Sequence, residues 1–456
     1  MVQSNKIIPR FSALEYGLIL LCFSVCLTGA LLLPMNQCPD EFMRSRLIVW
    51  MVEKGTLPTG DELETMALNP PPGLNYGFSF ALRPYLSAMI GAAFVKAAML
   101  FSDSDRVLLM AARLGSVLSV TGCCWFCLRL GHRLFDRRSS AILFAALVCF
   151  LPQVMFLGMY HNNDALSLFA VCMMLYYLVE GYDMGWPVKS CVGLALAFSV
   201  GLLSYYSIYG WILMCTVFCI VSVVTDREIT DKGGLIVKRA GLIAGICLLL
   251  AGWFFIRSAI LHDGDFLGVA YEEVSRSRVE KMGYILFPFR DFRAEGLSVT
   301  GFLRSNQFHW LRVTAGSFVG TFGNMTLFLP MFLYGIYFTI FAFGLLRFLT
   351  VLLRRRVGRR DGLLMLVMLV SGGINFALHF WSSYTCDYQP QGRYVITLIL
   401  PLAYMLTYGV DKTTVAVQNP RPGKATELNP ATVLTVLWLA LFALAALGTM
   451  VKMLPQ

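Results

Sequence analysis

The stretch SALEYGLILLCFSVCLTGALLLPMNQCPDE, residues 12–41, joins a long apolar run to two adjacent carboxylates, Asp40 and Glu41. The apolar part, residues 12–34, is long enough to exceed the ~20 residues that cross a bilayer as a helix. It is also too long for the core of a signal peptide, and no cleavage site of small residues follows it. We therefore expect a retained membrane anchor that delivers the two acids to the opposite face of the membrane.

The whole chain has the composition of a polytopic membrane protein. Of its 456 residues, 57% are hydrophobic and 14% are charged, against about 25% charged in a typical soluble domain. The net charge is +10, but the basic residues cluster in short loops, as they do in membrane proteins that use charge to set their orientation. The charge therefore does not indicate a nucleic-acid partner. We predict an all-α integral-membrane protein with a single domain over residues 1–456.

Four basic loops set the predicted topology, because short basic loops stay on the cytoplasmic side. These loops are 129–139, 226–239, 354–360 and 411–424. With a cytoplasmic N-terminus, all four are inside if the chain has about eleven spans. The predicted spans are residues 12–34, 107–128, 140–158, 164–181, 189–203, 207–225, 238–260, 325–350, 362–383, 392–410 and 430–452.

This topology predicts two long outer loops, residues 35–106 and 261–324. Residues 78–101 in the first of them are apolar but contain Arg83 and Lys96. A span there would reverse every later loop, so we expect interfacial helices that lie against the membrane in this loop. The alternative is a true span with a different arrangement downstream.

The two acids stand at the start of a predicted helix over residues 39–54. Acidic residues in a first turn complement the helix dipole, and Asp40 has Arg44 one turn later as an ion-pair partner. On that interpretation the two acids only stabilise the helix and have no role in function. An ionisable group at the membrane edge that faces a cavity is, however, also suited to act as a general base, and we favour this second interpretation.

A second polar group, in YHNNDALSLF at residues 160–169, opens a predicted helix on the same outer face. Asn162, Asn163 or Asp164 is a good N-cap, but one cap needs only one polar side chain. His161, Asn163 and Asp164 are therefore candidates to hold a sugar hydroxyl. Two carboxylates and a histidine on separate helices are only a weak indication of a divalent metal ion. We predict no metal ion and no other cofactor.

A third group, YQPQGRY at residues 388–394, places Arg393 on the side that the positive-inside rule disfavours. A helix N-terminus favours anions, and a guanidinium grips a phosphate with two hydrogen bonds. We predict that Arg393 binds a phosphate with Gln391 and Tyr394 beside it. The alternative for Arg393 is a side chain that extends along the membrane interface to water.

The second outer loop is rich in arginine and aromatic residues. Arg290 and Arg293 belong to it, and its net charge is positive although it lies outside. Such a loop is suited to cover a phosphate-bearing headgroup or to contact anionic membrane lipids. Its alternative is a solvated loop with interfacial aromatic anchors.

Together these motifs resemble the GT-C superfamily of integral-membrane glycosyltransferases. In that superfamily an acidic residue, often in an Asp-Glu pair, follows the first span, and a second acid sits at the next outer turn after a basic loop like RLGxRLF. This chain has PDE at residues 39–41, RLGHRLFDRR at 129–138 and NND at 162–164. Together with QGRY at 391–394, these motifs are most similar to a bacterial branch of the superfamily.

The resemblance implies a polyprenyl-phosphate-sugar donor, used on the extracytoplasmic face of the plasma (inner) membrane, and a glycan or lipid acceptor. It implies that Asp40 is the general base, that Glu41 supports it and that Asp164 is the second acid. Arg393 would hold the phosphate of the leaving group, and Arg44 would lie in the same substrate site. A single attack would invert the anomeric centre.

Two departures and two rival functions accompany this interpretation. Phe42 and Met43 follow the acid pair, where relatives often have His or Tyr, and no WWDYG motif is present, which argues against transfer to asparagine. A lipid or solute transporter would place ionisable groups near the middle of its spans. An O-antigen polymerase or ligase would share the lipid-linked donor and use arginine-rich outer loops.

Overall fold

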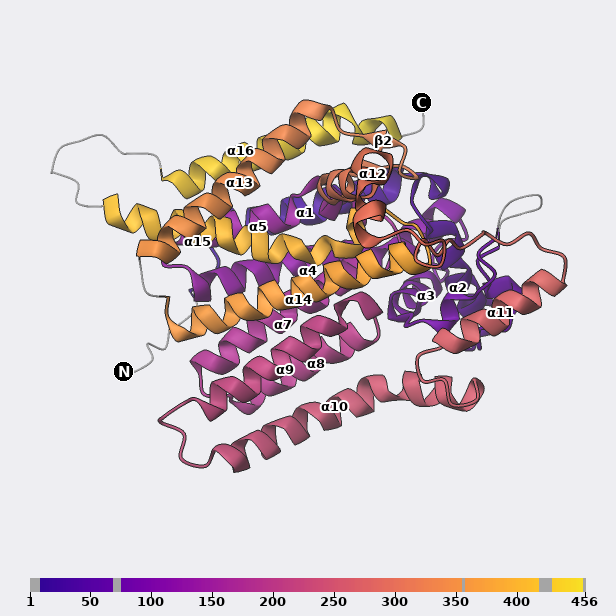
Figure 1. Ribbon diagram of the computed structural model, residues 1–456, viewed down its shortest axis with the longest axis horizontal. Helices are drawn as coiled ribbons and strands as arrows, with labels where there is room; N and C mark the ends of the chain where they lie inside the picture. Colours follow the sequence, from indigo (N-terminus) through magenta and orange to yellow (C-terminus); the bar gives the residue numbers. More distant parts are fainter. Residues whose placement is uncertain (1–8, 69–74, 355–356, 418–428, 454–456) are drawn as a thin grey trace.

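The computed structural model describes residues 9–68, 75–354, 357–417 and 429–453. Long helices lie side by side in a bundle, and shorter elements gather at the end of the bundle opposite the N-terminus (Figure 1). The α-helices are α1 (Ala13–Leu32), α2 (Glu41–Lys54), α3 (Leu86–Ala98), α4 (Asp105–Leu134), α5 (Arg138–Cys149), α6 (Pro152–Leu157), α7 (Asp164–Asp183), α8 (Val188–Leu202), α9 (Tyr209–Val224), α10 (Lys232–Leu261), α11 (Val269–Lys281), α12 (Val299–Val319), α13 (Met331–Arg354), α14 (Arg359–Thr385), α15 (Ile399–Val417) and α16 (Pro430–Gly448).

Short elements complete the described chain. One antiparallel strand pair, β1 (Thr321–Phe322) and β2 (Leu327–Phe328), follows α12. The 3-10 turns are η1 (Met35–Gln37), η2 (Leu63–Thr65), η3 (Phe80–Leu82), η4 (Tyr206–Ile208), η5 (Gly392–Leu398) and η6 (Met450–Met453). The prediction of an all-α polytopic membrane protein is confirmed.

Nine helices in the described part of the chain are long and apolar enough to cross a membrane. The two remaining predicted spans are shorter in the structure. Helix α5 ends at Cys149 and the chain restarts as α6, because Pro152 supplies no amide hydrogen to continue the α5 ladder and instead fits the first turn of the new helix. The other shortened span, predicted over residues 189–203, corresponds to α8, which has 15 residues.

Residues 35–106, the predicted first outer loop, contribute α2 and α3 to the end of the bundle opposite the N-terminus (Figure 1). Helix α3 has 13 residues, about 20 Å of helix, which is too short to cross the ~30 Å hydrocarbon core. It packs against α2 and α4. Residues 78–101 therefore contribute a short helix of the cap, as predicted, and not a full span.

Helices α4 and α7 form the centre of the bundle. Helix α4 packs against α1, α3, α5 and α7, and most of α7 is buried. Close approach depends on small residues: a Cβ on Gly131 of α4 would come within 2.8 Å of the Cα of Ala141 in α5. Helices α10 and α13 lie at the edges with mostly exposed apolar side chains, as expected of faces that contact lipid.

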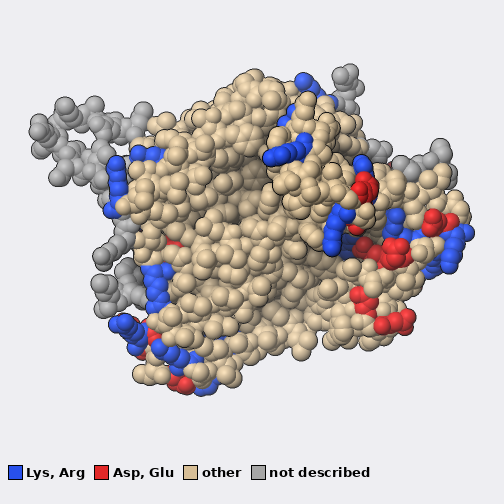
Figure 2. Space-filling model, viewed as in Figure 1, with Lys and Arg blue, Asp and Glu red and all other residues tan. Residues whose placement is uncertain are grey.

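The predicted inner loops meet at the N-terminal end of the bundle. Arg138 donates a hydrogen bond to the carbonyl of Arg10 at 3.0 Å, and Arg359 donates to the carbonyl of Thr225 at 2.7 Å. Lys412 pairs with an acid of the loop before α5. Figure 2 shows charged side chains at both ends of the visible face with an uncharged belt between them. Of the predicted inner loops, residues 355, 356 and 418–424 lie outside the described residues.

Impermeant maleimide labelling tests this topology. Both Asp103 and Arg227 are exposed, at opposite ends of the bundle, and Cys386 is the exposed cysteine of the described chain. In a Cys386→Ser background, Asp103→Cys should label in intact cells, and Arg227→Cys should label only after permeabilisation. The reverse pattern would contradict the predicted orientation.

Candidate active site

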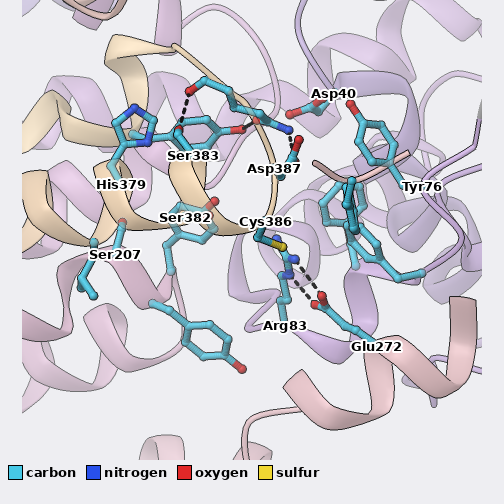
Figure 3. A pocket seen from close by; sticks show the side chains of 18 of the residues that line it. Asp40, Tyr76, Arg83, Ser207, Glu272, His379, Ser382, Ser383, Cys386 and Asp387 are labelled. Atoms are coloured by element: carbon cyan, nitrogen blue, oxygen red, sulfur yellow. Dashed lines mark hydrogen bonds and ion pairs between the residues drawn. The ribbon is translucent and has the colours of Figure 1, made fainter. Parts of the chain in front are cut away.

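A cavity of about 360 Å³ lies at the capped end of the bundle, within the size range of small-molecule sites. It is built from α2, the loop before α3, the η4 turn before α9, α11, the end of α14 and the turn that follows α14 (Figure 3). Its lining residues are Asp40, Arg44, Tyr76, Phe78, Phe80, Arg83, Tyr205, Tyr206, Ser207, Glu272, Phe289, Asn375, Leu378, His379, Ser382, Ser383, Cys386, Asp387, Gln389 and Tyr394.

Asp40 stands at the N-cap position of α2 but does not cap the helix. Its φ of 59° lies in the left-handed region, which aspartate adopts more readily than most residues with a side chain. The carboxylate accepts a hydrogen bond from Arg393 Nη2 at 2.5 Å. Asp40 therefore has a strained backbone conformation, and its carboxylate faces the cavity instead of capping α2.

The Arg393 guanidinium is positioned by close packing of η5 against α12. A Cβ on Gly392 would come within 2.1 Å of the backbone nitrogen of Phe318, so only glycine fits there. The Gly392 amide donates to Ser317 Oγ at 2.7 Å. The Arg393 side chain is 2% exposed, against 22% for Asp40. Asp40 lines the cavity, and Arg393 is buried behind it.

Two opposed effects act on the Asp40 carboxyl. Burial raises its pKa. The positive charges of Arg393 and Arg44 and the hydrogen bond from Arg393 together lower the pKa by more than burial raises it, so it lies below the ordinary value of 3.8. Asp40 is therefore ionised at neutral pH and available as a proton acceptor.

Glu41, the adjacent acid, faces away from the cavity. It accepts hydrogen bonds from Arg113 of α4 at 2.7 and 2.6 Å, and both side chains are 0% exposed. Arg113 also donates to the carbonyls of Ala30 and Leu33 at the end of α1. The pair therefore ties α1, α2 and α4 together, and Glu41 holds the position of Asp40 without lining the cavity.

The HNND segment lies against this ion pair. The backbone amide of His161 donates to Glu41 Oε1 at 2.9 Å, and burial lowers the pKa of its imidazole to about 3. Asn163 donates to the carbonyl of Pro84 at 3.3 Å and accepts from Ser87. His161 and Asn163 are thus buried beside the site and not on the cavity wall.

Asp164 begins α7 and is buried. It lies near enough to Arg393, Arg44 and Asp40 for their charges to act on it. The structure therefore brings together Asp40, Asp164 and Arg393 from three distant parts of the sequence. Asp164 stands behind the lining of the cavity.

Of the remaining predicted residues, Arg44 and Tyr394 line the cavity. The Arg44 guanidinium lies 4.4 Å from the ring centre of Phe80. Gln391 precedes η5, and its side-chain oxygen is buried without a hydrogen-bond partner among the described residues. Neither Arg290 nor Arg293 lines the cavity: Arg290 is exposed and pairs with Glu295 at 2.8 Å, and Arg293 stacks on Trp381.

Sequence reasoning missed three charged residues that line the cavity. Arg83 and Glu272 form an ion pair, at 2.5 and 2.9 Å, that joins the two predicted outer loops across the cavity. Asp387 precedes the QGRY motif by four residues. Asp387 and Arg393 belong to the same predicted outer turn, so the sequence could have indicated that Asp387 lies at the site. Arg83 and Glu272 are 189 residues apart, and nothing in the local sequence predicts that they pair.

No group of three or more histidine, cysteine, aspartate and glutamate side chains is arranged to hold a metal ion within the described ranges. The arrangement offers an ionised carboxylate on the wall of the cavity and a buried guanidinium behind it, at the end of the bundle opposite the N-terminus.

Comparison with known families gives one match. The family of dolichyl-phosphate-mannose-protein mannosyltransferases matches residues 85–259, which is less than half of the chain. No curated protein matches the sequence.

Solved structures match over nearly the whole chain. ArnT from Cupriavidus metallidurans, bound to undecaprenyl phosphate, is 14% identical with a TM-score of 0.53, over 95% of this chain and 70% of that one. The apo oligosaccharyltransferase of Archaeoglobus fulgidus is 13% identical, with a TM-score of 0.51, over 96% of this chain and 55% of its own. The mycobacterial arabinofuranosyltransferase AftD is 14% identical, with a TM-score of 0.51, over 98% and 29%. This chain therefore spans about half or less of the last two proteins.

The Glu41→Gln substitution tests the structural role of the second acid. It would leave the Arg113 guanidinium buried without its counter-charge, which costs about 3–5 kcal/mol of folding free energy. Asp40→Asn should cost less, because its amide oxygen still accepts from Arg393 at a partly open position. Thermal unfolding in detergent would compare the two, with Glu295→Gln as an exposed control. Equal stability of the Glu41→Gln variant and the wild type would contradict this role.

Proposed function

Because the chain has the fold of the GT-C superfamily of integral-membrane glycosyltransferases, we propose that it transfers a sugar from a polyprenyl-phosphate donor to a glycan or lipid acceptor. The observation that carries the proposal is the Asp40–Arg393 ion pair. Its carboxylate lines a cavity at the end of the bundle opposite the basic loops, and its guanidinium is buried directly behind that carboxylate. One member is a proton acceptor and the other is a phosphate-binding group, which are the two functions that this transfer needs.

The proposed reaction is a single displacement. The acceptor hydroxyl oxygen attacks the anomeric carbon, and the bond from that carbon to the phosphate oxygen breaks. Asp40 takes the hydroxyl proton, and polyprenyl phosphate leaves with the bonding electrons. Since attack occurs opposite the leaving group, the anomeric centre inverts. A phosphate needs charge stabilisation more than it needs a proton, so guanidinium groups suffice on the leaving side.

Arg393 has a double use in this mechanism. Without substrate it neutralises Asp40 at 2.5 Å. A lipid phosphate would compete for the same guanidinium, with Arg44 on the cavity wall as a second cation. Binding of the donor would therefore release Asp40 from its ion pair and raise its pKa toward the ordinary value, which makes it a stronger base when the substrate is present.

An apolar cavity of about 280 Å³ supports a lipid-linked donor. It lies between α12, α13, α14 and α15, and Thr314 is its one polar lining residue among Leu311, Ala315, Phe318, Phe338, Phe341, Phe376, Val395, Leu398 and Leu402. Val395 lies two residues after Arg393. A polyprenyl chain in this cavity would place its phosphate near that guanidinium. The ArnT structure, which has the same fold, holds undecaprenyl phosphate.

The proposed site faces the extracytoplasmic side of the plasma membrane. It lies at the end of the bundle opposite the basic loops, and basic loops stay in the cytoplasm. Polyprenyl-phosphate donors on that side need no nucleotide. We propose that residues 1–456 form one integral-membrane domain, whose extracytoplasmic end is covered by loops 35–106 and 261–324.

The Asp40→Asn variant tests the proposed base. In nanodiscs with a panel of radiolabelled polyprenyl-phosphate sugars and envelope lipids, its transfer rate should fall by about 10²–10⁴-fold, the contribution of a general base. Binding of polyprenyl phosphate should persist. Asp263→Asn is the matched control, because Asp263 is exposed at a φ of 50° that asparagine tolerates. Transfer by Asp40→Asn within threefold of the control would remove the assignment.

The Arg393→Ala variant tests the phosphate site. Loss of a charge-assisted contact should weaken binding of polyprenyl phosphate about tenfold or more, measured by equilibrium binding of the radiolabelled lipid. Arg290→Ala removes an exposed guanidinium outside the cavity and should leave the affinity unchanged. Equal affinities of the two variants would return Arg393 to a purely structural role.

A further inference from the structure

A chain of hydrogen bonds joins Asp40 to a second carboxylate of the cavity, Asp387. Arg393 Nη2 donates to Asp40 and, at 3.1 Å, to the Tyr394 hydroxyl. That hydroxyl donates to Gln389 Oε1, and Gln389 Nε2 donates to Asp387 Oδ2 at 2.5 Å. The DYQPQGRY segment thus fixes Asp387 relative to the proposed base through three linking side chains and four hydrogen bonds.

Asp387 differs from the other carboxylates that line the cavity. Asp40 pairs with Arg393, and Glu272 pairs with Arg83. In the described chain, Asp387 forms no ion pair, and only its Oδ2 accepts a side-chain hydrogen bond. Burial raises its pKa, and the nearby charge of Asp40 adds to this effect. A half-buried carboxylate with one open oxygen is suited to accept hydrogen bonds from a ligand.

The end of α14 adds two more open polar groups to the same cavity. His379 and Ser382 are three residues apart, so they share one face of the helix. His379 is 8% exposed, and its Nε2 is buried without a hydrogen-bond partner in the described structure. Figure 3 shows Ser382 pointing into the cavity, and no described residue bonds to its hydroxyl. Buried polar atoms are normally satisfied, so the unpaired Nε2 of His379 indicates a missing polar ligand. The exposed hydroxyl of Ser382 lies on the same helix face as a second contact for that ligand.

We propose that Asp387, with His379 and Ser382, recognises the hydroxyl groups of the transferred sugar. The inference rests on the proposed function and names the part of the donor that this wall binds. Sugar hydroxyls donate hydrogen bonds to the carboxylate, and the serine hydroxyl and imidazole nitrogen complete the pattern. A phosphate would be repelled by Asp387, so the phosphate belongs beside Arg44 and Arg393 and the sugar belongs beside α14.

The alternative is that Asp387 only orders the turn after α14. Its bond with Gln389 would serve that purpose. A turn-ordering residue would affect stability, or all ligands equally, whereas a sugar-binding residue affects only ligands that carry a sugar. Comparison of a bare lipid with its glycosylated form therefore separates the two roles.

The test measures binding of bare C55 polyprenyl phosphate and of its mannose, glucose, galactose and arabinose conjugates to full-length protein in nanodiscs. For the wild type, at least one conjugate should bind tenfold or more tightly than the bare lipid. In Asp387→Asn this advantage should fall about tenfold, the effect of one charge-assisted hydrogen bond, while binding of the bare lipid is unchanged or slightly tighter. Asp263→Asn is the control and should retain the full advantage.

Ser382→Ala is the second variant, since its small exposed side chain makes a folding defect unlikely to obscure the result, and it should reduce the advantage about threefold. If both variants keep the full preference for a conjugate over the bare lipid, or if the wild type prefers no conjugate, this inference is overturned and the proposed function is not. Failure of the wild type to bind even bare polyprenyl phosphate would instead overturn the proposed function.

Discussion

The buried ion pair between Glu41 and Arg113 is the constraint on which the site depends. Two charges at 0% exposure are tolerated only with full hydrogen bonding, and here Arg113 is also bound by the last carbonyls of α1. The pair fixes where the chain leaves the first span and where α2 begins. Asp40, one residue earlier, is thereby held at a left-handed backbone position with its carboxylate toward Arg393. Adjacent acids in one motif thus have different tasks, one in holding the helices and one in facing the cavity.

In the proposed mechanism, Asp40 and the donor phosphate compete for the Arg393 guanidinium. Arg393 is almost fully enclosed, so its charge must be matched at all times. Asp40 supplies that match in the free protein, and in the proposed mechanism the donor phosphate replaces it. The same event would bring the substrate in and free the base. The hydrogen-bonded segment that carries Arg393 also carries Asp387, so phosphate, base and sugar contacts would be set by one short stretch of chain.

Much of this architecture could be predicted from local sequence. The hydropathy pattern and the basic loops gave the helical membrane fold, and the acid pair, NND and QGRY motifs identified the residues that converge as Asp40, Asp164 and Arg393. The sequence did not reveal which of these side chains are buried. Whether Glu41 faces the cavity or pairs with Arg113 depends on a contact between residues 72 positions apart. For the same reason the outer-loop arginines were grouped with the site, although Arg290 is satisfied five residues away by Glu295. The break before α6 and the ion pair of Arg83 with Glu272 likewise follow from tertiary packing.

The most direct measurement of the central claim is a cryo-EM structure of the full-length protein in nanodiscs with C55 polyprenyl phosphate. The account predicts phosphate density within hydrogen-bonding distance of Arg393 and Arg44, a lipid chain between α12 and α15, and an Asp40 carboxylate separated from Arg393. Lipid bound elsewhere, with the Asp40–Arg393 pair intact and the cavity without phosphate, would contradict it.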